Sequence, residues 1–149
     1  MGDAGNNDFD WRKALRFIER KLEAQEAKTR ELEVLIVDDD DNDTLLLTEE
    51  LNHFYCHVTV CHDSVEASKL IATRKFDIAF IDQKMPKLTG LELIQKSFPD
   101  KPTTTNFVIV TGFSDSPMIE QTLKVGAVLA PKPLNREKLT LFLRPRNDR

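Results

Sequence analysis

Several short apolar runs in this chain end directly in a residue that can take part in chemistry. Runs of this kind, rich in Val, Ile and Leu, are typical of parallel strands buried on both faces of a sheet. The reactive positions follow three runs: Asp38 and Asp39 after residues 34–37, Asp82 after 78–81, and Thr111 after 108–110. Because the carboxyl ends of parallel strands meet at one edge of a sheet, we expect these side chains to converge. With the ammonium group of Lys132, they suit a divalent cation and a phosphoryl group.

Strand and helix patterns alternate from Val34 onward, with short connections. The expected strands are residues 34–37, 58–60, 76–81, 106–110 and 128–130. The expected helices are residues 44–54, 64–74, 91–98, 117–125 and 136–143, with N-caps at Asp63 or Ser64, at Ser116 and at Asn135. Five such βα units predict an α/β fold with a five-stranded, doubly wound parallel sheet.

The N-terminal segment has a different pattern. Residues 1–8 are predicted to be disordered, and residues 9–33, which lack Gly and Pro, to form a helix capped by Asp8 or Asp10. The four-three spacing of a coiled coil is followed by Trp11, Leu15, Ile18 and Leu22, and is continued by Gln25, Thr29 and Leu32. Two interpretations are open: a homodimer formed through residues 9–33, or one amphipathic helix packed on its own domain.

Composition limits the class of protein. The length of 149 residues fits one domain with an appendage, and the net charge of −4 argues against nucleic-acid binding. No apolar run approaches the ~20 residues that span a membrane, and the acidic N-terminus is not a signal peptide, so we expect a cytoplasmic protein. Cys56 and Cys61 are expected to be free, structural and on opposite faces of a strand.

The ordered set of residues at the strand ends resembles the receiver domain of two-component response regulators. The resemblance covers residues 34–144 and leaves residues 145–149 as a C-terminal tail. The motifs that carry it are Asp38-Asp39, Asp82 followed by Met85-Pro86 and Gly90, Thr111, and Lys132-Pro133. The resemblance implies a flavodoxin-like strand order of 2-1-3-4-5 and no effector domain in this chain.

The resemblance also implies a role for each residue at the site. Asp82 is the implied phospho-acceptor, and a histidine kinase or histidine phosphotransfer protein is the implied donor. The implied ligands of a Mg²⁺ cofactor are Asp38, Asp39, Asp82 and the backbone carbonyl of Lys84. Thr111 and Lys132 are implied to contact the phosphoryl oxygens, and the peptide bond before Pro133 to be cis. The resemblance implies that the chain catalyses its own phosphorylation and dephosphorylation without being a conventional enzyme.

Leu129 departs from the family pattern, because receivers usually carry an aromatic residue three positions before the lysine. The usual coupling of an aromatic rotamer to Thr111 is therefore not expected here. The neighbouring acids Asp40, Asp41 and Asp43 are interpreted as solvated carboxylates in the loop and first turn of a helix, where they suit the helix dipole.

The main alternative is a receiver-fold interaction or dimerisation module that works without phosphorylation. A calcium loop that begins at Asp38 is disfavoured, because Asp43 stands where an EF-hand needs Gly. A dehalogenase-like phosphatase is disfavoured too, because no acidic pair follows the fourth expected strand.

Overall fold

The computed structural model describes residues 10–97 and 104–146, and for residues 23–29 it describes the backbone only. The chain divides into two units, Met1–Glu31 and Leu32–Arg149. The disorder predicted for residues 1–8 and most of the predicted C-terminal tail lie outside the described residues.

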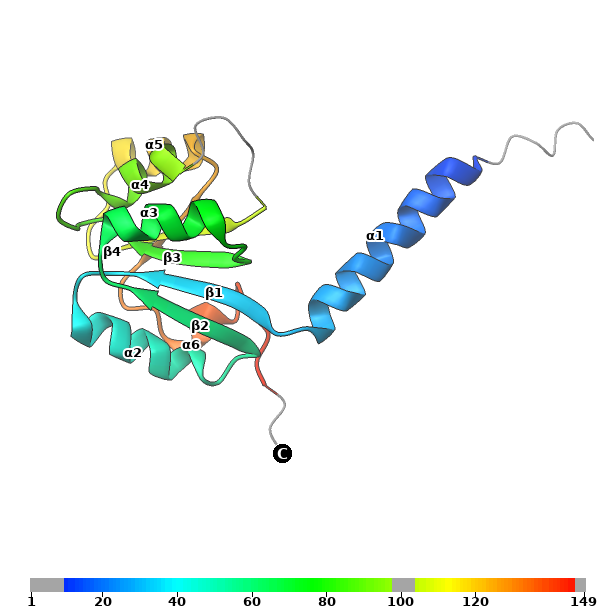
Figure 1. Cartoon of the computed structure of the whole chain (residues 1–149), viewed down its shortest axis with the longest axis horizontal. Coiled ribbons are helices and arrows are strands. Elements are labelled where there is room, and N and C mark those ends of the chain that lie inside the picture. The colour runs from blue at the N-terminus through cyan, green and yellow to red at the C-terminus, as the bar shows by residue number, and fades with distance from the viewer. Residues whose placement is uncertain (1–9, 98–103, 147–149) are drawn as a thin grey trace, which may run out of the picture. The chain divides into compact units, whose positions relative to one another are not determined.

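The larger unit is built on one five-stranded parallel sheet (Figure 1). Its strands are β1 Leu32–Val37, β2 Cys56–Cys61, β3 Ile78–Asp82, β4 Asn106–Thr111 and β5 Val128–Pro131. They lie in the order β2-β1-β3-β4-β5, and every pairing is parallel. This confirms the predicted fold class and strand order.

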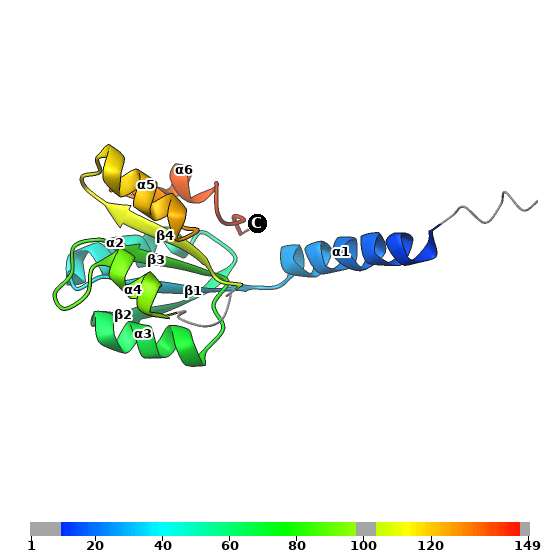
Figure 2. The ribbon, with the colours of Figure 1, turned by 90° about the horizontal axis from the view of Figure 1, so that it is seen from above.

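Helices cover both faces of the sheet. They are α2 Asp41–Leu51, α3 Ser64–Thr73, α4 Gly90–Ser97, α5 Ser116–Lys124 and α6 Arg136–Leu139. In Figure 1, α2 and α6 lie on one face, and α3, α4 and α5 lie on the other. Figure 2 shows α3 beside α4, with which it is in contact. The helix α5 is in contact with β5.

The core consists of two apolar layers, one on each face of the sheet, because alternate residues of the central strands point to opposite sides. On β1, Leu35 belongs to the layer under α3 and α4, and Ile36 to the layer under α2 and α6. Cys56 and Cys61 are both buried and belong to different layers, as the sequence predicted.

In the larger unit, two of the predicted N-caps are confirmed and one is wrong. Asp63 accepts hydrogen bonds from the N–H groups of Val65 and Glu66 at the start of α3, and Asn135 caps α6. The prediction of Ser116 as the cap of α5 was wrong, because Asp115 accepts the N–H of Met118 instead. A carboxylate in that position also complements the helix dipole.

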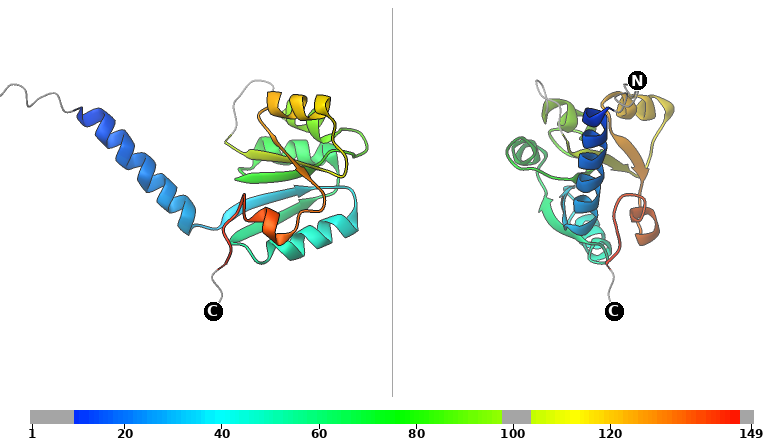
Figure 3. Two further views of the ribbon diagram at one scale, coloured as in Figure 1. Left: turned by 180° about the vertical axis from the view of Figure 1, so that it is seen from behind. Right: turned by 90° about the vertical axis from the view of Figure 1, so that its right-hand side faces the viewer.

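Several element boundaries differ from the prediction, and for β1 and β2 the reason is pairing across the sheet. β1 begins at Leu32, which pairs with Cys56, so the N-terminal helix does not extend to residue 33. β2 likewise extends over Cys56–Cys61. α6 ends at Leu139, after which the chain makes turns, and Pro145 forms an antiparallel bridge with Phe54. Figure 3 shows α6, drawn in orange-red, beside α2, with which it is in contact.

The smaller unit contains the helix α1, Trp11–Thr29. Asp10 Oδ1 accepts the N–H groups of Arg12 and Lys13, so Asp10 is the cap that the sequence offered. The apolar side chains of the first three turns are exposed: Trp11 at 71%, Leu15 at 56%, Ile18 at 51% and Leu22 at 58%. Leu32, predicted to continue this row, lies in β1 instead. Among the described residues, none of the helices is long and apolar enough to cross a membrane.

Gly90 is required where α4 starts next to the end of β3. A Cβ at this position would lie 2.8 Å from the carbonyl oxygen of Asp82 and 3.2 Å from Cα of Gln83, both backbone atoms. A Cβ at Gly112 would meet nothing within 4 Å. We predict that Gly90→Ala lowers the unfolding free energy by about 1–3 kcal/mol through overpacking.

The matched control is Gly112→Ala, which should stay within about 0.5 kcal/mol of the wild type. Urea denaturation of the two variants measures the difference. Equal destabilisation by both would contradict the close approach of α4 to β3.

Candidate functional site

Three carboxylates meet at the carboxyl edge of the sheet, as predicted. Asp38 and Asp39 follow β1, and Asp82 is the last residue of β3. One oxygen from each lies within 4.8 Å of the other two. Asp38 and Asp82 are buried, whereas Asp39 is exposed. Carboxylate oxygens are the ligands that Mg²⁺ prefers, so this donor set fits that ion.

The sheet itself holds these residues in place. The N–H of Asp38 donates to the carbonyl of Cys61 on β2, and the N–H of Gln83 donates to Val110 on β4. Beyond β5, the N–H of Lys132 donates to Thr111 at 2.8 Å. Each strand end is therefore fixed by its neighbour, and the site inherits the rigidity of the sheet.

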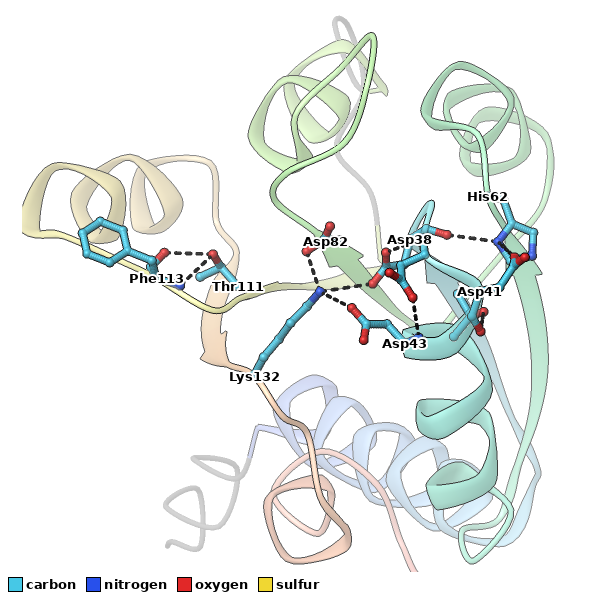
Figure 4. A network of polar contacts seen from close by, with 10 residues as sticks. Asp38, Asp41, Asp43, His62, Asp82, Thr111, Phe113 and Lys132 are labelled. Carbon is cyan, nitrogen blue, oxygen red and sulfur yellow. Dashed lines mark hydrogen bonds and ion pairs between the residues drawn. The ribbon is translucent and has the colours of Figure 1, made fainter.

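Lys132 contacts the carboxylates with its ammonium group (Figure 4). Its Nζ lies 3.0 Å from Asp82 Oδ1 and 3.3 Å from Asp38 Oδ2. A third carboxylate, Asp43 in the first turn of α2, is closer, with its Oδ2 at 2.8 Å. The peptide bond between Lys132 and Pro133 is cis, as the resemblance implied.

Burial and charge shift the pKa values at this edge. Loss of solvent raises the pKa of Asp38 and of Asp82, although the ion pair with Lys132 lowers both pKa values in part. For Lys132, burial lowers the pKa, but hydrogen bonds to Asp43 and Asp82 outweigh it and raise the pKa overall. The lysine is therefore a permanent cation. The ionised forms of Asp38 and Asp82 nevertheless remain unfavourable at this edge, because burial outweighs the effect of the lysine on their pKa values.

Thr111 lies at the end of β4, but its hydroxyl is engaged locally. The Oγ1 atom donates to the carbonyl of Phe113 at 2.8 Å and accepts the N–H of the same residue at 3.3 Å. Figure 4 shows this pair on the other side of Lys132 from the carboxylates. Leu129, in the position of the usual aromatic residue, pairs with Ile109 and packs partly buried against the core.

The loop that carries Lys84 is tied to α3. Ser64 Oγ donates to the carbonyl of Pro86 at 2.9 Å and accepts the N–H of Leu88 at 3.2 Å. Lys87, with a φ of 73°, pairs with Asp63 at 2.6 Å. The sequence identified Asp63 and Ser64 as helix caps only, and their role in holding this loop could not be seen before the chain was folded.

The interpretation of Asp43 as a solvated carboxylate was wrong. Asp40 does cap α2, by accepting the N–H of Asp43, and Asp41 is exposed, as expected. Asp43, however, reaches Lys132, because the first turn of α2 lies beside the loop after β5. The helical position of Asp43, one turn from the cap, was the only signal in the sequence.

The sequence model of the response regulator receiver domain matches residues 34–144. The chain belongs to the response regulator receiver domain family. Receiver domains generally bind Mg²⁺ at an acidic pocket, and this receiver has the corresponding cluster of Asp38, Asp39 and Asp82.

Solved structures agree with this assignment. A CheY-like receiver domain from Methanospirillum hungatei superposes with a TM-score of 0.68 at 27% identity, covering 74% of this chain and 89% of its own. A Francisella response regulator receiver domain has a TM-score of 0.65 at 26% identity, covering 74% of this chain and 91% of its own.

Curated relatives are longer proteins. The response regulator protein PilR of Pseudomonas aeruginosa is 30% identical over 118 residues, which are 76% of this chain and 26% of PilR. A cyclic di-GMP phosphodiesterase of Thermotoga maritima is 29% identical over 109 residues, which are 72% of this chain and 29% of that enzyme. The receiver described here thus spans less than a third of either relative.

Because its carboxylate is buried, Asp38 should make the metal-free receiver less stable as pH rises through its pKa. Because the folded pKa of Asp38 is raised above the ordinary 3.8, the stability that protonation contributes is complete below that pH. It is lost as pH rises through the raised pKa. We predict that Asp38→Asn is more stable than the wild type in EDTA, by a few degrees in Tm near neutrality.

Urea denaturation between about pH 3.5 and 7 measures this gain in unfolding free energy, which should grow with pH. Asn keeps the Oδ1 that accepts the N–H of Asp40 at 3.0 Å. Asp41→Asn controls for the loss of one negative charge. A variant that is less stable than the wild type across this range would contradict the predicted cost of burying this carboxylate.

Proposed function

We propose that this receiver accepts a phosphoryl group on Asp82 in a two-component system and signals through protein contacts. One observation carries the proposal: Asp82, Asp38, Asp39 and Lys132 meet at one edge of the sheet. Phosphoryl transfer depends mainly on positioning and on neutralisation of oxygen charge, and this arrangement supplies both.

Asp82 is the proposed nucleophile. One of its carboxylate oxygens bonds to phosphorus while the bond from phosphorus to the donor imidazole nitrogen breaks, which leaves an acyl phosphate. The proposed donor is a histidine kinase or a histidine phosphotransfer protein. The ion pair with Lys132 orients the Asp82 carboxylate.

The proposed ligands of Mg²⁺ are Asp38, Asp39, Asp82 and the backbone carbonyl of Lys84. The bound ion would neutralise charge on the phosphoryl oxygens. Asp38 is preorganised for this role, because its Oδ1 accepts the N–H of Asp40 while its Oδ2 faces Lys132. The ties of Ser64 to Pro86 and Leu88 support the loop that carries Lys84.

The proposed response to phosphorylation involves Lys132 and Thr111. Lys132 would donate an N–H of its ammonium group to a phosphoryl oxygen. The Thr111 hydroxyl would give up its hydrogen bond to the Phe113 carbonyl and donate to a phosphoryl oxygen as well. Because Leu129 has no ring to swing, we propose a modest structural change on activation. The surfaces of α5 and β5 would carry that change to a partner protein.

The first test is phosphorylation by a small donor such as phosphoramidate, with Mg²⁺ or with EDTA, followed by intact-mass measurement. The wild type should gain one phosphoryl group with Mg²⁺ only. Asp82→Asn should gain none, because its amide is not a nucleophile, while its thermal unfolding stays cooperative.

Asp41→Asn is the matched control and should be phosphorylated as the wild type is, because Asp41 is exposed and lies outside the carboxylate cluster. A wild type that is folded, binds no beryllofluoride and gains no mass would favour the alternative, a module that works without phosphorylation.

The exposed apolar row of α1 supports a second proposal, association through that helix. Trp11, Leu15, Ile18 and Leu22 keep coiled-coil spacing and are at least half exposed. We propose that a second copy of the chain covers this row.

The cytoplasmic location expected from the sequence stays a prediction.

Ile18→Lys should convert the proposed dimer to a monomer, because it places a charge in the middle of the row. Phe17→Lys is the matched control: Phe17 is 58% exposed, yet it lies one position off the spacing. Sedimentation velocity measures both. A wild type that is monomeric at high micromolar concentration would contradict the proposal, as would a dimer that both variants disrupt equally.

A further inference from the structure

Lys132 has a carboxylate partner that belongs neither to the phospho-acceptor nor to the proposed metal ligands. Asp43 Oδ2 lies 2.8 Å from Lys132 Nζ, closer than the nearest oxygen of Asp82 at 3.0 Å or of Asp38 at 3.3 Å. In Figure 4 the ammonium group points into the space between these three carboxylates.

Asp43 is anchored well enough to act on Lys132. It lies in the first turn of α2, where its backbone N–H donates to the capping carboxylate of Asp40 at 3.0 Å. Its side chain is 43% exposed and that of Lys132 is 28% exposed, so the pair is only partly screened by water. The carboxylate is therefore held beside the ammonium group by the helix that carries it.

We propose that Asp43 is a positioning residue that competes with the phosphoryl group for Lys132. The inference rests on the proposed role of Asp82 as the phospho-acceptor. A lysine ammonium group has three N–H donors, and the three carboxylates occupy its surroundings. A phosphoryl group on Asp82 must take at least one of these donors away from a carboxylate.

Asp43 opposes that exchange in two ways. Its hydrogen bond retains one N–H donor of Lys132 that the phosphoryl oxygens could otherwise use, and its negative charge repels those oxygens. Asp43 thus weakens the binding of a phosphoryl group, or of an analogue, at Asp82.

The same residue should affect Mg²⁺ in the opposite direction. Without Asp43, Lys132 would pair more fully with Asp38 and Asp82, the proposed ligands, and the site would lose one negative charge. Both effects weaken cation binding in the absence of a phosphoryl group. General damage to the site would weaken the binding of both beryllofluoride and Mg²⁺. Changes of opposite sign in the two affinities would therefore be specific to the role of Asp43.

The test compares the full-length wild type with Asp43→Asn. Mg²⁺ affinity is measured alone by calorimetry, and beryllofluoride affinity is measured at saturating Mg²⁺ by ¹⁹F NMR. We expect Asp43→Asn to bind beryllofluoride about three- to fivefold more tightly at low ionic strength, and Mg²⁺ alone more weakly. The difference should shrink in high salt.

Asp41→Asn is the matched control. Asp41 lies in the same first turn and carries the same charge, but its side chain is 89% exposed and its ion pair is with His62. It should change both affinities clearly less than Asp43→Asn does. Asp43→Glu, which keeps the charge, should bind beryllofluoride more weakly than Asp43→Asn.

The outcomes separate this inference from the proposed function. If the wild type binds beryllofluoride but Asp43→Asn binds it equally or more weakly, the competition is wrong and the role of Asp82 is untouched. Equal effects of Asp41→Asn and Asp43→Asn would also overturn it, because net charge alone would then explain both. If the folded wild type binds no beryllofluoride, the proposed function itself fails.

Discussion

The attraction between Lys132 and a group of buried or partly buried carboxylates is the interaction on which this receiver depends. Parallel strands bring Asp38 and Asp82 to one edge of the sheet, where burial raises the pKa of both. The ammonium group of Lys132 offsets part of that cost. The site can therefore form, but the negative charge of its carboxylates is only partly neutralised. Such a charge favours the binding of a divalent cation.

The rest of the larger unit serves to hold those few groups still. Apolar layers on both faces bury the central strands β1 and β3, and hydrogen bonds between the strand ends fix the residues that follow them. Two further contacts restrain the surrounding loops: Gly90 lets α4 approach Asp82, and Ser64 ties the loop after β3 to α3. Precision at the site thus comes from the sheet and from loops that the helices restrain.

The positions of the strand ends could be predicted from the sequence, because a continuous apolar run followed by an acid indicates a buried strand with the acid at its carboxyl end in an alternating α/β chain. Asp38, Asp39, Asp82 and Lys132 meet as predicted for that reason. Features that depend on tertiary contacts could not be predicted from the sequence. Leu32 fitted a helical spacing equally well, and only its pairing with Cys56 places it in β1. Asp43 looked like a helix-start acid until the fold brought it to Lys132.

We propose that the acyl phosphate forms on Asp82 and requires a divalent cation. Borohydride reduction after phosphorylation converts an aspartyl phosphate to homoserine, and peptide mass spectrometry then locates the modified residue. We expect homoserine at position 82 when phosphorylation is carried out with Mg²⁺, and an unmodified peptide when it is carried out in EDTA. Reduction at a different acid, or equal reduction at position 82 without a divalent cation, would contradict it.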